Sequence, residues 1–176
     1  SDDFAVTRAM KEAGLDIYFV PQALAASIED CTFRELLEFT TRQMKITRVY
    51  APHLWKQSLV GSIVFNLVFV WGISIIIFGS VADLSFWYAL ASLFLVSAFS
   101  IGKSQLRLRA VKLVLRNYEN ELNGQFFAQN TLWVLSPALF FYNGLMALFS
   151  RKIVWRGIRY ELKSPTETVI INADVR

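Results

Sequence analysis

The chain has 176 residues, of which 55% are hydrophobic and 15% aromatic, and its mean hydropathy is +0.40. This apolar share exceeds that of an ordinary soluble domain and is concentrated in three stretches, so composition favours a membrane protein. The formal net charge is +4, but Lys and Arg flank the apolar stretches instead of forming one basic stripe, which argues against nucleic acid as a partner. One cysteine, Cys31, and one histidine, His53, exclude an internal disulfide and a Cys/His metal cluster.

The N-terminal part reads as a short α/β segment. An acidic doublet, Asp2 and Asp3, precedes a one-sided apolar pattern that predicts a helix over residues 4–13. Gly14 follows where a left-handed C-cap is expected. Residues 16–21 then give a β-branched and aromatic run ended by Pro, which predicts a strand.

A second helix is predicted from Phe33 to about Arg48. Thr32 and Glu35 have the spacing of a capping box, which marks its start. Arg42, Lys45 and Arg48 recur at helical spacing, so their charges are expected to lie along one edge of this helix.

Three stretches near the length of a membrane crossing follow, over residues 58–79, 84–101 and 131–149. About 20 apolar residues are needed to cross the hydrocarbon layer as a helix, and the first stretch contains no ionisable group. Asn66 and Asn143, inside apolar runs, are expected to hydrogen-bond to neighbouring helices. Residues 105–118 alternate basic and apolar residues, which predicts a separate interfacial helix between the second and third stretches.

The basic residues indicate a cytoplasmic N-terminal part, because they precede the first stretch and follow the second, while the link between these two holds only Asp83. Three full crossings would place the basic C-terminal residues outside, which conflicts with the tendency of Lys and Arg to lie on the cytoplasmic side. Pro137 and Asn143 lie inside the third stretch. A re-entrant or broken helix there, buried against the other helices, would return the C-terminal part to the cytoplasm, and we favour this over a true third crossing.

In this order, the features resemble a known enzyme family. The features are SDDF at residues 1–4, YFVP at 18–21, RQMKITRVY at 42–50, the apolar stretches and WRGIRY at 155–160. Together they are similar to the C-terminal half of ceramide-glucosyltransferase-like enzymes, in glycosyltransferase families 2 and 21. The resemblance covers nearly all of the chain. It implies an α/β end of a GT-A catalytic domain at residues 1–56, a membrane region of two or three apolar helices and an interfacial helix at 57–164, and a tail at 165–176.

The resemblance also implies a reaction. Such enzymes transfer a sugar, typically glucose from UDP-glucose, to a lipid hydroxyl at the cytoplasmic face with inversion. Asp3 matches the catalytic base of the family and Asp2 its acidic neighbour, although the doublet taken alone favours a helix N-cap. A Mg²⁺ or Mn²⁺ ion is implied as well, with ligands outside these 176 residues, so the chain alone is expected to be inactive.

The basic residues supply the candidate donor site. The motif that faces the diphosphate in the family is matched with an imperfect register, because Ile46 stands where its Trp is expected. The candidates for substrate binding are Arg42, Gln43, Lys45, Arg48, Arg156 and Arg159. Headgroup-facing positive charge is the alternative for each. The competing hypothesis for the whole chain is a non-enzymatic membrane scaffold or transporter subunit.

Overall fold

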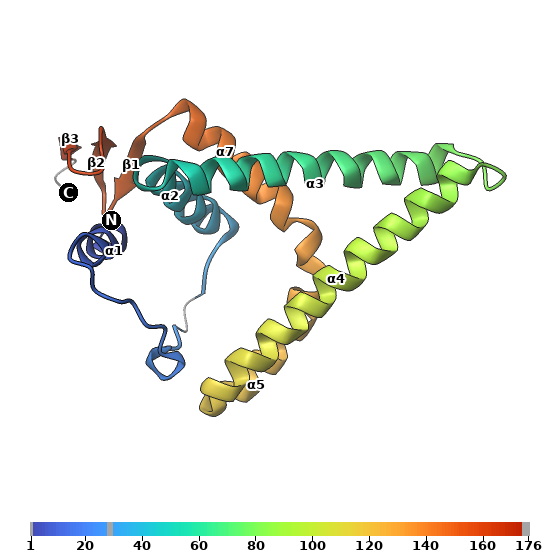
Figure 1. Ribbon diagram of the computed structural model, residues 1–176, viewed down its shortest axis with the longest axis horizontal. Coiled ribbons are helices and arrows are strands. Elements are labelled where there is room, and N and C mark those ends of the chain that lie inside the picture. Colours follow the sequence, from blue (N-terminus) through green and yellow to red (C-terminus); the bar gives the residue numbers. More distant parts are fainter. Residues whose placement is uncertain (1, 28–29, 174–176) are drawn as a thin grey trace. The chain divides into compact units, whose positions relative to one another are not determined.

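The computed structural model describes residues 2–27 and 30–173, and within these ranges the chain is mostly helical with one three-stranded sheet (Figure 1). The helices and strands are α1 (Asp2–Glu12), α2 (Phe33–Tyr50), α3 (Pro52–Phe78), α4 (Leu84–Val114), α5 (Glu119–Gly124), α6 (Phe126–Thr131), α7 (Ser136–Phe149), β1 (Lys152–Trp155), β2 (Ile158–Leu162) and β3 (Thr168–Ala173). The chain divides into two compact units. One contains α1, α2, α3 as far as Gly61, α7 from Leu139 and the sheet, and the other contains most of the apolar helices.

The first helix ends as predicted. Gly14 has a φ of +68°, and its N–H donates to the carbonyl of Lys11 at 3.1 Å, while the N–H of Leu15 donates to the carbonyl of Met10 at 2.9 Å. This pair of bonds is the Schellman motif, in which a left-handed residue lets the chain satisfy the last helical carbonyls.

The strand predicted over residues 16–21 is wrong. Residues 15–20 belong to no helix or strand, and Pro21–Ala23 forms a 3₁₀ turn. The side chains of Tyr18 and Phe19 are 79% and 80% exposed. A β-branched and aromatic run becomes a strand only when another strand pairs with its backbone, and within the described residues this segment has no such partner.

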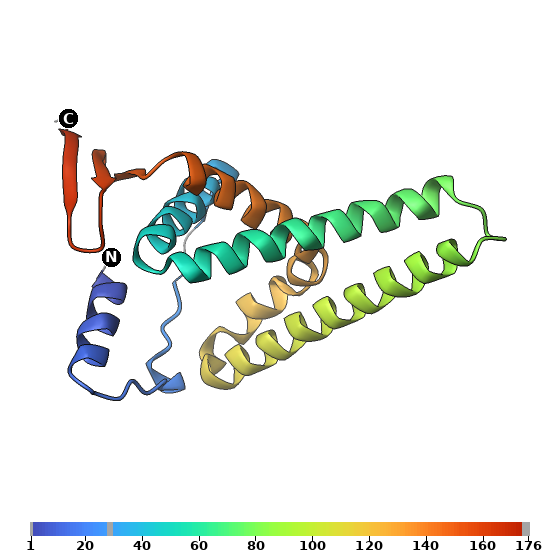
Figure 2. The same ribbon diagram turned by 45° about the horizontal axis from the view of Figure 1, so that its top comes forward.

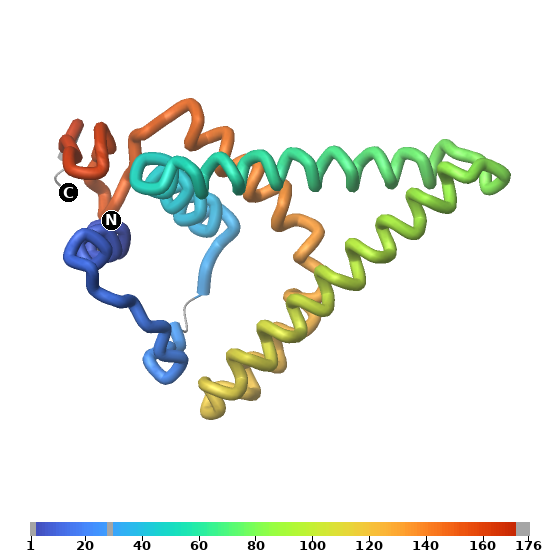
Figure 3. The backbone as a smooth tube through the Cα atoms, viewed as in Figure 1, coloured from blue at the N-terminus to red at the C-terminus, as the bar shows by residue number. Residues whose placement is uncertain are grey.

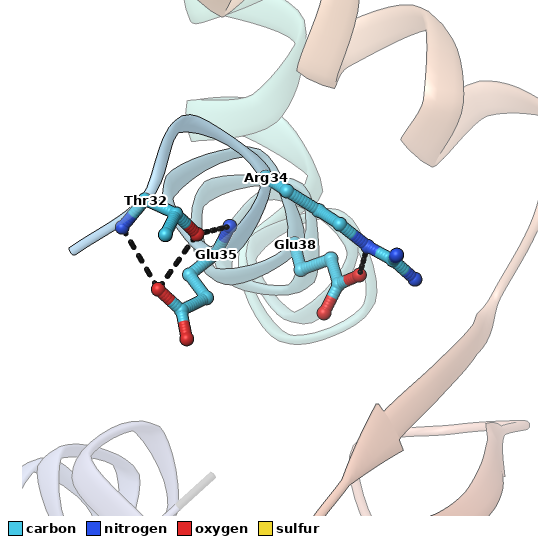
Figure 4. A network of polar contacts seen from close by, with 4 residues as sticks. All are labelled: Thr32, Arg34, Glu35 and Glu38. Carbon is cyan, nitrogen blue, oxygen red and sulfur yellow. Dashed lines mark hydrogen bonds and ion pairs between the residues drawn. The ribbon is translucent and has the colours of Figure 1, made fainter.

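The capping box at the start of α2 is confirmed (Figure 4). The N–H of Glu35 donates to Thr32 Oγ1 at 3.3 Å, and Glu35 Oε2 accepts from the Thr32 N–H at 2.8 Å and from its hydroxyl at 2.7 Å. These bonds satisfy amides that have no partner inside the helix.

The core of the first unit lies where α2, the start of α3 and α7 meet. Met44, Trp55 and Ala147 are buried together, with Leu59 packed against them. Gly144 permits this close packing, because a Cβ there would lie 2.8 Å from Leu59 Cδ1. The predicted role of Asn143 is confirmed: it is 2% exposed, and its Oδ1 accepts from the Thr41 hydroxyl of α2 at 2.7 Å.

The C-terminal residues form an antiparallel sheet in the order β1-β2-β3. The turn between β1 and β2 consists of Arg156 and Gly157, whose φ angles of 49° and 79° are both positive, as a type I′ turn requires. Residues 168–173 of the predicted tail belong to this sheet as β3, which pairs with β2 across an irregularity between Arg159 and Tyr160.

In the second unit, α3 and α4 are packed against each other through Gly72, where a Cβ would lie 3.2 Å from Leu93 Cγ. Both helices are long and apolar enough to cross a membrane, as predicted. The separate interfacial helix predicted over residues 105–118 is wrong, because α4 continues unbroken to Val114. The sequence from Ser104 to Val114 holds no Pro or Gly, so nothing in it ends the helix.

The third apolar stretch is a broken helix, as predicted. The segment Phe126–Val134 and helix α7 meet at 59° across a break at Leu135, so they amount to one further span only if taken together. Pro137 lies in the first turn of α7, where proline is tolerated, but its missing N–H and its ring prevent the preceding helix from continuing through it. Asn66 departs from its prediction, because its Nδ2 donates to the Ser62 carbonyl of its own helix at 2.7 Å.

Candidate functional site

The predicted site residues all lie on elements of the first unit. Phe4 of α1 stacks on Tyr50 at the end of α2 with ring centroids 5.7 Å apart. The N-terminal end of α1 lies beside the sheet in both ribbon views (Figures 1 and 2). The structure therefore brings the acidic start of α1, the end of α2 and the β1–β2 hairpin into one unit, as a shared site requires.

Asp3 occupies the first turn of α1, and its side chain is exposed. Within the described parts of the chain, its carboxylate takes part in no hydrogen bond or ion pair. A carboxylate that no other group occupies can accept a proton from a substrate hydroxyl. Asp2 is the first residue of α1, and its side chain lies outside the described part.

The basic face of α2, formed by Arg42, Lys45 and Arg48, makes contacts that the sequence did not indicate. Lys45 Nζ donates to the Lys152 carbonyl at 2.8 Å, and Arg42 Nη1 reaches the Val154 carbonyl at 3.5 Å. Arg48 Nη1 donates to the carbonyls of Ala147 and Leu148, the latter at 2.8 Å. The three cations thus lie along the backbone that leads from the end of α7 into β1.

The pairing of β1 with β2 explains why these carbonyls are available. With a two-residue turn, Trp155 and Ile158 form the first pair, and hydrogen-bonded pairs then alternate along an antiparallel ladder. The backbone groups of Lys152 and Val154 therefore point away from β2, at the open edge of the sheet. Lys45 and Arg42 satisfy acceptors on that edge, which blocks it from pairing with another strand.

Arg48 is also bound through the face of its guanidinium, which lies 5.3 Å from the centre of the Trp55 ring. Burial, and secondarily the positive charge of Arg151, lower the pKa of Arg48 from its ordinary value. Trp55 is itself fixed, because its indole N–H donates to the Gly144 carbonyl at 3.3 Å. Sequence reasoning missed Trp55, and only its place next to the basic helix could have indicated it.

Lys45 is half-buried, and this burial lowers the pKa of its ammonium group. Arg42 stacks over Phe39 with 5.4 Å between the guanidinium carbon and the ring centre. None of the three cations of the basic face pairs with a carboxylate in the described residues. Positive charge without acidic partners favours a site that receives an anion.

The remaining candidates point outward. Gln43 and Arg159 are exposed, and in the described ranges their side chains bond to no other residue. Arg156 is exposed at the tip of the hairpin, where its guanidinium lies 5.2 Å from the centre of the Trp155 ring. These side chains are free to meet a ligand, whereas Lys45 and Arg48 already have partners.

The described residues contain no group of three or more His, Cys, Asp or Glu side chains that could hold a metal ion. The Mg²⁺ or Mn²⁺ ion that the resemblance implies, with ligands outside this sequence, therefore stays a prediction, and no step of the chemistry below passes through a metal.

The comparison with protein families is decisive. A model described as "Glycosyl transferase family 21" matches residues 1–168. The chain belongs to glycosyl transferase family 21. Comparisons with curated proteins and with solved structures gave no match. Membership of this family makes the chain a glycosyltransferase sequence and favours the enzyme over the scaffold hypothesis.

Proposed function

We propose that this family 21 chain is part of a membrane enzyme that transfers a sugar, glucose in the first instance, from a UDP-sugar to a lipid hydroxyl at the cytoplasmic face. The family match over residues 1–168 carries the proposal. Residues 1–56 would form the end of a GT-A catalytic domain, and the apolar helices would hold the enzyme beside its lipid acceptor.

The chemistry follows from what each side chain can do. The Asp3 carboxylate takes the proton from the acceptor hydroxyl, and the hydroxyl oxygen attacks the anomeric carbon of the sugar. The bond from that carbon to the diphosphate oxygen breaks in the same displacement, so the configuration inverts and UDP leaves. Negative charge grows on the diphosphate, and fixed positive groups stabilise it.

The basic residues divide according to their partners. Gln43, Arg156 and Arg159 carry donors that no described residue takes, and Arg42 holds the Val154 carbonyl only at 3.5 Å, so these four can bind a diphosphate. Arginine can grip two phosphate oxygens at once. Lys45 and Arg48 would add to the positive field around it. Asp2, next to the base, would help to position the acceptor.

The test is transfer of radiolabelled sugar from UDP-glucose to membrane lipids by the full-length protein and by its Asp3→Asn variant. The variant is expected to lose about 10²- to 10⁴-fold in rate, the usual contribution of a general base. Asp16→Asn is the matched control, because Asp16 is also exposed near α1 and only accepts a bond from Tyr18 at 3.2 Å. Equal rates in the wild type and Asp3→Asn would remove Asp3 as the base, and no transfer from any nucleotide sugar would remove the proposal.

A further inference from the structure

We infer that Arg48 is a positioning residue: it fixes the C-terminal turn of α7, and through it the β1–β2 hairpin, instead of binding the diphosphate itself. Its effect on the reaction rests on the proposed function, whereas its effect on the hairpin does not.

The first observation is the chemistry of the helix end. The last four carbonyls of a helix have no partner within it, and Ala147 and Leu148 are among those of α7, which ends at Phe149. Arg48 Nη1 donates to both of these carbonyls. A cation at a helix C-terminus is also stabilised by the partial negative charge there.

The second observation is that Arg48 acts together with Trp55. The guanidinium lies against the Trp55 ring, and the Trp55 N–H donates to the Gly144 carbonyl one turn earlier in α7. Trp55 is 8% exposed and Ala147 is fully buried, so this arrangement is packed within the core. We call Arg48 and Trp55 together the α7 clamp.

The α7 clamp extends to the hairpin through the chain itself. Only Ser150 and Arg151 separate α7 from β1, and the backbone runs from the helix directly into the sheet (Figure 3). The hairpin carries Arg156 and Arg159, both proposed to meet the diphosphate. Displacing Arg48 from α7 would therefore move two candidate ligands at once.

The same contacts argue against Arg48 as a phosphate ligand. Nη1 has two N–H donors, and the two carbonyls use both, so only the donors on Nη2 and Nε could meet a phosphate. One face of the guanidinium is against the indole. A diphosphate that pulled this side chain away would leave two helix-end carbonyls without this donor, and the bond to Ala147 is part-buried, so its loss costs free energy.

The test measures hydrogen exchange of the hairpin amides, UDP affinity and kinetics in the full-length protein. In Arg48→Met, the amides of residues 152–162 are expected to exchange about tenfold faster or more, because local opening becomes easier. kcat is expected to fall, and any rise in the Kd for UDP is expected to come together with faster hairpin exchange, since the displaced hairpin carries Arg156 and Arg159. Arg48→Lys keeps a cation at α7, so its exchange is expected to lie between that of Arg48→Met and the wild type.

Three further variants keep the result interpretable. Trp55→Phe retains a ring but removes the bond to Gly144, and it is expected to raise hairpin exchange even if Arg48→Met fails to fold. Arg34→Ala, on the same helix, removes only an exposed pair with Glu38 and is expected to change neither readout. Arg159→Ala is expected to differ from Arg48→Met in its hairpin exchange, which stays unchanged while the Kd for UDP rises.

Unchanged hairpin exchange in both Arg48→Met and Trp55→Phe would overturn the inference. A rise of about tenfold in the Kd for UDP without faster exchange would identify Arg48 as a diphosphate ligand instead. If the proposed function is wrong, the wild type shows neither transfer nor UDP binding. Hairpin exchange alone then tests the α7 clamp.

Discussion

The indole N–H of Trp55, in the first turn of α3, donates to the backbone carbonyl of Gly144 in α7 at 3.3 Å. This bond joins two apolar helices that are 89 positions apart at this point of the sequence. It lies where Leu59 packs against Gly144, so hydrogen bonding and close packing occur at one crossing.

The first prediction concerns Gly144. Gly144→Ala is expected to cost little, because the added Cβ meets Leu59 Cδ1, the end of a flexible side chain that can shift. Gly144→Val brings more atoms against Leu59 and is expected to destabilise by about 1–3 kcal/mol, as overpacking does. Unfolding in detergent measures both. Gly61→Ala is the control: nothing lies within 4 Å of its Cβ position, so it is expected to stabilise by about 0.5–1 kcal/mol.

The second prediction concerns the bond between Thr41 and Asn143. Asn143→Ala is expected to destabilise by about 1–3 kcal/mol, since it removes a buried partner and leaves a gap. A double-mutant cycle with Thr41→Val and Asn143→Leu is expected to give a coupling of about 1 kcal/mol. Additive effects of the two single changes would mean that the hydrogen bond contributes nothing measurable.

The third prediction is a pH dependence at the start of α2. Hydrogen bonds from the Thr32 side chain, and then from its backbone, hold the pKa of Glu35 below its ordinary value of 4.5. The stabilisation is therefore fully present above pH 4.5 and is lost as the pH falls through the lowered pKa. Exchange of the first amides of α2, corrected for intrinsic rates, is expected to rise in that acidic range.

Glu35→Gln is expected to remove this pH dependence. Glu38→Gln is the control, because among the described residues Glu38 pairs only with Arg34, on the same exposed helix surface and 2.9 Å away (Figure 4). An identical acid response in the wild type and Glu35→Gln would show that another carboxyl group controls the helix start.

The fourth prediction separates stability from function at the hairpin tip. Arg156 has a φ of 49°, a conformation that costs a residue with a Cβ about 1 kcal/mol and that asparagine tolerates better. Arg156→Asn is expected to slow hairpin exchange and to raise the KM for the UDP-sugar, because the guanidinium is lost. Gly157→Ala is the converse control and is expected to speed exchange. An unchanged KM in Arg156→Asn would remove Arg156 from the substrate site.

The local elements of the fold could be predicted because their signals are local. Thr32 and Glu35 mark a helix start by spacing, Gly14 marks a helix end, and uncharged stretches mark α3 and α4. The strand over residues 16–21 failed because strand formation depends on a distant partner. The separate helix over 105–118 failed because alternating charge fits the end of a long helix as well as an interfacial one.

The arrangement of the basic residues of α2 was predictable from the sequence, but their contacts were not. Helical spacing placed Arg42, Lys45 and Arg48 on one edge, as the structure has them. Their acceptors are backbone carbonyls of β1 and α7, and every residue has such a carbonyl, so no pattern of side chains points to them. The role of Asn143 was predictable because a buried amide in an apolar helix needs a partner.

The two-residue turn between β1 and β2 also limits where the length of this chain can change. Side chains alternate between the two faces of a strand, so one extra residue between Trp155 and Ile158 would invert all of β2. Leu162, now 3% exposed, would turn to the open face, and the charge of Arg159 would turn inward. Insertions are therefore expected to be tolerated in the connection at residues 163–167 and rejected at the turn.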